Sequence, residues 1–148
     1  PVGVAGMRVA TKHGLGNACL VLVDDLPVVA GEVRSLPAAV WGTLREGTAD
    51  RFTFDVKAGE KLSFEAVANR FGKDADPLVT IRDAAGAWVA DRDNDPGLFF
   101  DCRFAHTFAA AGTYTVEVRD ARFRGDGHPY VLRVGRFPAG RVAVPAAG

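Results

Sequence analysis

The stretch Asp-Arg-Asp-Asn-Asp-Pro-Gly at residues 91–97 places three aspartates at alternate positions ahead of a turn. Carboxylate oxygens are the ligands that calcium prefers, and the ion takes six to eight of them. An EF-hand loop needs glycine at its sixth position and glutamate at its twelfth. Those positions hold Pro96 and Cys102 here. The sequence therefore excludes an EF-hand loop and leaves open a calcium site of another kind.

Such a site would draw carboxylates from several loops. The alternative is a solvated turn, in which the aspartates cap backbone N–H groups and pair with neighbouring arginines. The many arginines of this chain favour the turn, so no cofactor is required, although the residues allow Ca²⁺. The candidate ligands are Asp76, Asp93, Asp95, Asp101 and Asp120.

Catalysis is the second chemistry to weigh, because paired carboxylates hydrolyse glycosidic bonds. The sequence has no GxSxG, HExxH or P-loop motif. Ser63 lies in a predicted strand at a position expected to face solvent. His106 shares the parity of Phe104 and Phe108, which predicts a neutral histidine in the core. We expect that the chain is not an enzyme.

Trp41 and Trp88 are the candidate ligand-binding residues, because exposed indoles stack on sugar rings. The alternative is that both serve the core, where large aromatic residues usually pack.

The composition limits the partners. Lysine plus arginine and aspartate plus glutamate number 18 each, so there is no basic excess to favour nucleic acid. No apolar run approaches the roughly 20 residues of a membrane span, so we expect no membrane insertion. Cys19 and Cys102 lack metal-type spacing; they could form a disulfide in an exported protein or be two small half-buried residues.

Short alternating runs separated by glycine-containing turns fill the chain from residue 50 onward. Period-two patterning with aromatic and β-branched residues is typical of half-buried strands. The sequence therefore predicts an all-β protein, an antiparallel β-sandwich of jelly-roll type with no substantial helix. The runs lie at 52–56, 61–69, 78–82, 87–91, 102–108, 113–118 and 130–136.

Strand parity also predicts where the connections lie. If each connection reverses the chain, the short turns at 57–60, 83–86 and 110–112 share one end of the sandwich. The long charged loops at 46–49, 70–77, 92–101 and 120–129 then share the other. Because binding sites gather where loops cluster on a rigid scaffold, this second end is the predicted site.

Four segments together resemble the bacterial pre-peptidase C-terminal (PPC) domain: EGTADRFTFDVKAGEKLSFEAVANR, DPLVTIRDAAGAWVADRDND, AGTYTVEVRD and YVLRVG. The resemblance covers about 100 residues and implies a jelly-roll sandwich that is attached to secreted enzymes or repeated in surface proteins. It implies no catalysis; some relatives bind calcium, and others bind polymers such as collagen or chitin.

The flanks resemble pieces of immunoglobulin-like TIG (IPT) domains, on GLGNACLVLVDDLPVVAGE and RFPAGRVAVPAAG. The predicted domains are the last strands of such a domain plus a linker at 1–30, the PPC-like sandwich at 36–136, and a linker or further domain start at 137–148.

The resemblance predicts a non-catalytic module of a secreted or surface-displayed multidomain bacterial protein. It would act as a spacer, a stabiliser, or a unit that binds an extracellular polymer or protein, next to adjacent domains of its parent chain. The alternative is a calcium-stabilised carbohydrate- or protein-binding domain that targets an attached peptidase or glycosidase.

Overall fold

The computed structural model describes residues 2–29, 33, 35–124 and 126–139. Strands dominate, and the only helical element in these ranges is the short 3-10 turn η1 (Asn69–Phe71). The strands are β1 (Gly3–Met7), β2 (Ala10–Thr11), β3 (Gly14–Leu15), β4 (Cys19–Val23), β5 (Val28–Val29), β6 (Ala38–Arg45), β7 (Asp50–Val56), β8 (Lys61–Val67), β9 (Pro77–Arg82), β10 (Trp88–Arg92), β11 (Cys102–Thr107), β12 (Gly112–Asp120) and β13 (Asp126–Gly135).

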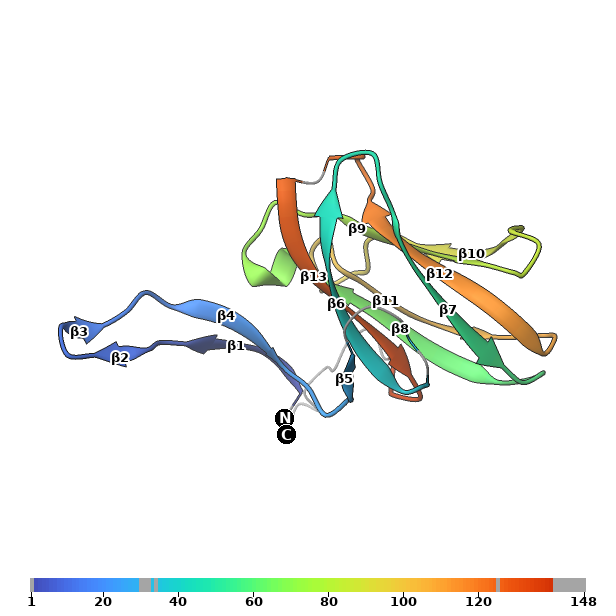
Figure 1. Ribbon diagram of the computed structural model, residues 1–148, viewed down its shortest axis with the longest axis horizontal. Helices are drawn as coiled ribbons and strands as arrows, with labels where there is room; N and C mark the ends of the chain where they lie inside the picture. The colour runs from blue at the N-terminus through green and yellow to red at the C-terminus, as the bar shows by residue number, and fades with distance from the viewer. Residues whose placement is uncertain (1, 30–32, 34, 125, 140–148) are drawn as a thin grey trace, which may run out of the picture.

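Two sheets pack face to face, as Figure 1 shows. One has four strands in the order β10-β9-β12-β7, and the other has five in the order β11-β8-β13-β6-β5. Every pair within the sandwich is antiparallel except β5 with β6, which is parallel. The predicted all-β sandwich is thus confirmed.

The core lies between the sheets and is rich in aromatic rings. Phe64 stacks on Phe104 with ring centroids 5.2 Å apart, and Phe108 meets Tyr114 edge-on at 4.7 Å. Alternation explains this burial: in β7 Phe52, like every second residue after it, points inward. Burying each such aromatic side chain stabilises the fold by roughly 1.5–3 kcal/mol.

The predicted runs all form strands of the sandwich, but two sandwich strands were missed. β6 pairs with β13 over most of its length, yet Ala38, Ala39 and Val40 are all buried, so its first half does not alternate. β5 is only two residues long, too short to give a pattern, and it lies at the end of residues 1–30, where a linker was expected.

The N-terminal flank forms a hairpin of β1 with β4 that continues into β2 with β3. Figure 1 shows it projecting away from the sandwich. The predicted division into domains and the TIG resemblance of the flanks stay predictions. Most of the predicted C-terminal linker, residues 140–148, lies outside the described ranges.

Candidate functional site at the loop pole

The long loops meet at one end of the sandwich, as parity predicts. Gly47 N–H donates to the carbonyl oxygen of Phe123, and Ala121 N–H donates to that of Asp76. At the opposite end Gly59 N–H donates to the carbonyl oxygen of Phe108. The prediction is confirmed, with one change: residues 126–129 already belong to β13. We call the end formed by residues 46–49, 70–77, 92–101 and 120–124 the loop pole.

Asp101 anchors this pole from within. Its carboxylate accepts hydrogen bonds from the backbone N–H groups of Ala68 (2.8 Å) and Asn69 (2.7 Å). It also accepts from the Nε of Arg70 at 2.7 Å and is fully buried. This predicted metal ligand therefore ties the loop at 92–101 to the end of β8.

Asp120 and Asp76 are engaged in a similar way. Asp120 accepts from the backbone N–H of Asp76 at 3.2 Å and from that of Arg122 at 2.9 Å. The carboxylate of Asp76 in turn accepts from the Nε of Arg122 at 2.9 Å. These contacts fix the loops at 70–77 and 120–124 to each other.

Asp76 and Asp93 lie close enough to each other for their carboxylates to interact. Burial raises the pKa of Asp76, and the charge of Asp93 raises it further. With its nitrogen turned toward the surrounding oxygens, the Asn94 amide lies 3.1 Å from Asp76 Oδ1 and 3.2 Å from Asp93 Oδ1. The same nitrogen lies 3.1 Å from the carbonyl oxygen of Phe100. The amide thus occupies the point where these oxygens converge.

The five candidate ligands all gather at the loop pole. Asp95 is buried there, and its backbone N–H donates to the carbonyl oxygen of Asp101. Within the described ranges, however, no three histidine, cysteine, aspartate or glutamate side chains form a group that could hold a metal ion. The calcium site stays a prediction.

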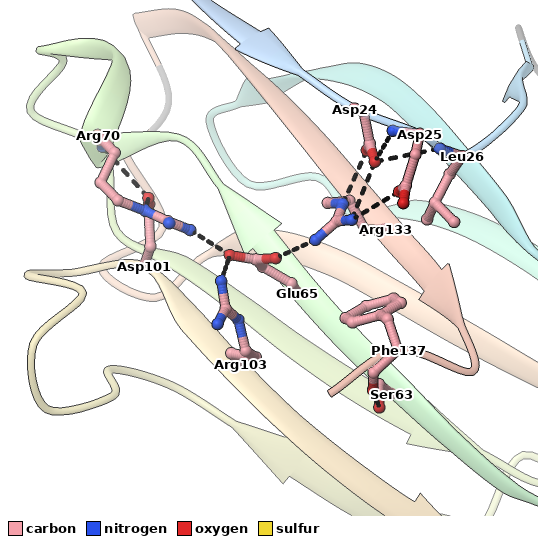
Figure 2. A network of polar contacts seen from close by, with 10 residues as sticks. All are labelled: Asp24, Asp25, Leu26, Ser63, Glu65, Arg70, Asp101, Arg103, Arg133 and Phe137. Atoms are coloured by element: carbon pink, nitrogen blue, oxygen red, sulfur yellow. Dashed lines mark hydrogen bonds and ion pairs between the residues drawn. The ribbon is translucent and has the colours of Figure 1, made fainter. Parts of the chain in front are cut away.

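A buried ionic network extends from Asp101 across the outer face of the five-stranded sheet (Figure 2). At its centre Glu65 accepts from Arg70 at 2.7 Å, Arg103 at 2.5 Å and Arg133 at 2.6 Å. Arg103 and Arg133 are its cross-strand neighbours on β11 and β13, so strand register brings them together. Burial raises the pKa of Glu65, but these three hydrogen bonds outweigh it and hold the pKa below its usual range.

The same network holds both flanks of the sandwich. Arg133 donates to both oxygens of Asp24, at 2.7 and 2.9 Å, and lies over the ring of Phe137. Ser63 is buried and donates to the carbonyl oxygen of Phe137. Its predicted exposure is wrong, because the flanking segments cover this part of the sheet.

The loop pole exposes three phenylalanines that the sequence reasoning missed. Phe99 and Phe123 are 77% and 59% exposed, with φ of 59° and 56°. Left-handed backbone at a bulky residue costs about 1–3 kcal/mol and persists where the surrounding structure enforces it. Arg122 stacks over the third ring, Phe100, at 4.7 Å. The available sequence signal was weak, since an isolated loop aromatic gives no periodicity.

The two predicted tryptophans are exposed but do not share a surface. Trp41 is 60% exposed on β6, and Trp88 is 62% exposed on β10. These strands belong to different sheets, so the two indoles lie on separate surfaces. Each indole alone remains a predicted contact.

The histidine considered for catalysis and one of the two cysteines pack against the core. His106 is half-buried and edge-on to Phe108 at 4.8 Å, and burial lowers its pKa. Cys102 is buried, which raises the pKa of its thiol to about 12. Cys19 is exposed, and both cysteines are free thiols, so the disulfide that the sequence allows is not formed.

Comparison with known proteins establishes the class of fold. No family model and no curated protein matches the sequence. Solved structures do match, and they are β-sandwich domains. None of the described helical segments is long and apolar enough to cross a membrane.

Three of the matching solved structures illustrate the likeness, and each matches over nearly its whole length. The first is a periplasmic inhibitor of g-type lysozyme from Aeromonas hydrophila (16% identity, 73% of this chain and 96% of that one, TM-score 0.55). The second is the pre-peptidase C-terminal domain of a collagenase from Bacillus anthracis (17% identity, 75% of this chain and 99% of that one, TM-score 0.52). The third is a surface-associated copper-binding protein of Methylomicrobium album (10% identity, 73% of this chain and 98% of that one, TM-score 0.51). The PPC resemblance is thereby confirmed at the level of the fold.

Proposed function

We propose that this chain is a non-catalytic binding module of an extracytoplasmic protein, and that the loop pole is its binding surface. The observation that carries this proposal is that Phe99 and Phe123 are exposed on loops that are anchored by ion pairs to the buried Asp101 and Asp76. Exposed aromatic side chains on loops held by a rigid scaffold are typical of an interaction site. A spacer would gain nothing from strained, exposed aromatic residues.

Two further observations support this proposal. A hollow beside Phe99 is lined by Asn94, Pro96 and Gly97, so the ring borders a concave surface. Proteins of the same fold include a lysozyme inhibitor and a surface-associated copper-binding protein, which bind different ligands. Their cellular locations motivate the extracytoplasmic assignment.

A retention assay tests the proposed surface. The purified chain is passed over collagen, chitin, cellulose and peptidoglycan, and the retained fraction is compared with that of Phe99→Ser and Phe123→Ser. We expect retention on one polymer, reduced at least fivefold by either change. Leu15→Ser is the control, because it removes an apolar residue of similar exposure from the hairpin that projects away from the sandwich. Equal retention of all variants would contradict the loop pole as the binding surface.

The calcium-stabilised alternative is favoured by the oxygens that converge on the Asn94 amide. If this amide turns its own oxygen inward, Asp76, Asp93 and Phe100 could bind Ca²⁺ with it. The change Asp93→Asn separates the two possibilities. Without calcium it should raise the melting temperature, because it removes the negative charge that raises the pKa of Asp76.

Thermal melts in EDTA and in millimolar Ca²⁺ give the measurement. A calcium site predicts that Ca²⁺ raises the melting temperature of the wild-type chain more than that of Asp93→Asn. An equal response of the two proteins would remove the alternative.

A further inference from the structure

Arg119 and Phe123 form a feature of the loop pole that the packing of the sandwich does not use. Arg119 lies on β12, and its guanidinium stacks over the Phe123 ring at 4.1 Å. Its Nη1 donates to the carbonyl oxygens of Asp120 (2.9 Å) and Ala121 (3.3 Å). The guanidinium is therefore held in place by a ring on one face and by two carbonyls at one corner.

The other edge of this guanidinium is available. Its Nε and Nη2 groups donate no hydrogen bond within the described ranges, and no carboxylate there lies within ion-pair distance of it. The neighbouring Arg122 and Arg124 differ, since both are paired with aspartates. Arg119 is thus a cation whose hydrogen-bonding fork is open.

The backbone of Phe123 is pinned in the conformation that keeps its ring on Arg119. Phe123 N–H donates to the carbonyl oxygen of Asp120, and its own carbonyl accepts from Gly47 N–H. Its φ of 56° is strained for a phenylalanine and would suit glycine. Strain of this kind at an exposed position points to function.

Resting on the proposed function of the loop pole, we propose that Arg119 and Phe123 bind a protein segment in which a carboxylate adjoins an apolar side chain. The free Nε and Nη2 edge matches the two oxygens of a carboxylate in a bidentate pair. The exposed remainder of the Phe123 ring takes the apolar neighbour. Arginine and aromatic residues with restricted motion are the side chains that dominate protein recognition.

A saccharide acid fits this site less well. A uronic acid would also present a carboxylate, but it needs an open aromatic face for its ring. Guanidinium groups cover a face of both Phe123 and Phe100. An anionic membrane surface is the other source of negative charge. The test therefore includes an acidic polysaccharide and an anionic vesicle as competing ligands.

NMR titration of the ¹⁵N-labelled chain with the peptide Gly-Ser-Glu-Phe-Glu-Ser-Gly tests the proposal. We expect saturable shifts of the amides of residues 119–123, and at least tenfold weaker binding when glutamine replaces both glutamates of the peptide. Arg119→Gln and Arg119→Lys should each weaken binding at least tenfold, because lysine cannot form the bidentate pair. Arg124→Gln, which removes a cation that is already paired, should bind as the wild-type chain does.

The variant Phe123→Gly shows whether a loss of binding comes from the missing ring rather than from unfolding. Glycine accepts the left-handed backbone, so this variant should melt no lower than the wild-type chain while it binds the peptide at least tenfold more weakly.

Absence of saturable shifts, or equal losses for Arg119→Gln and Arg124→Gln, would overturn the proposal. So would stronger binding, dependent on Arg119, to polygalacturonate or to phosphatidylglycerol vesicles. If these variants bind normally while Phe99→Ser loses polymer retention, the proposed function stands and the carboxylate site fails.

Discussion

Glu65 is the residue on which the outer face of the five-stranded sheet depends. Its buried carboxylate accepts hydrogen bonds from three arginines, two of which also bind Asp101 and Asp24. Breaking a buried ion pair by removing one partner destabilises a protein more than the pair itself contributes, because the other charge stays desolvated. Glu65 therefore links the loop pole with the flanking segments.

We predict that Glu65→Gln lowers the free energy of unfolding by about 3 kcal/mol at pH 7, measured by urea denaturation. Glu117→Gln is the control: Glu117 also lies between two arginines, Arg51 and Arg82, but on the solvent face of the other sheet, so it should cost about 1 kcal/mol or less. Equal costs would contradict the role of burial.

The pH dependence of this difference has a definite sign. The pKa of Glu65 is lower in the folded chain than in the unfolded one, so its stabilisation is present above the ordinary glutamate pKa of about 4.3. It is lost as pH falls through the folded value. The difference between wild type and Glu65→Gln should therefore narrow below about pH 4, and a difference that stays constant down to pH 3 would contradict this.

β5 and the residues just before it depend on side-chain contacts to stay on the sheet. β5 has two residues, and its parallel pairing with β6 supplies few hydrogen bonds. Ala39 N–H donates to the carbonyl oxygen of Pro27, and Asp24 is held by Arg133. The ion pair thus fixes an edge strand that backbone pairing alone would leave weak.

Hydrogen exchange should reveal this dependence. Asp24→Ala should speed the exchange of the amides of Leu26, Val28, Val29 and Ala39 at least tenfold, while β8 and β12 stay protected. Asp25→Ala is the adjacent control, because Asp25 is exposed and reaches Arg133 only at 3.6 Å. Equal acceleration by both changes would argue against the Asp24 contact.

The whole molecule is a sandwich with a hairpin attached rather than one continuous core. The residues of the buried hydrophobic cluster begin at Val33, and Val29 is a partly buried residue packed against it. The hairpin exposes Met7, Val9 and Leu15 instead. Because these side chains are exposed, they add little to the stability of the sandwich. A two-stranded hairpin is itself only marginally stable in water.

We predict that a chain beginning at residue 24 folds and melts within about 3 °C of the full chain, measured by circular dichroism. A chain beginning at residue 33 loses Asp24 and β5 and should melt at least about 5 °C lower. A large loss in the first truncation would show that the hairpin stabilises the sandwich.

Alternation in strands such as β7 and β12 made the sandwich predictable, because a period of two places apolar side chains on one face whatever lies beyond the strand. The same parity placed the long loops at one end. It failed at Ser63, because alternation cannot show that a flank covers the outer face.

The sequence by itself therefore determined the β-sandwich, the shared end of the charged loops and the set of aspartates gathered there. The tertiary structure alone decided what each carboxylate binds: Asp101 caps backbone amides and Asp76 pairs with Arg122. It also decided that Phe123 projects beside an open Arg119. Periodicity reports which face a side chain is on, whereas its partners depend on contacts between loops far apart in the chain.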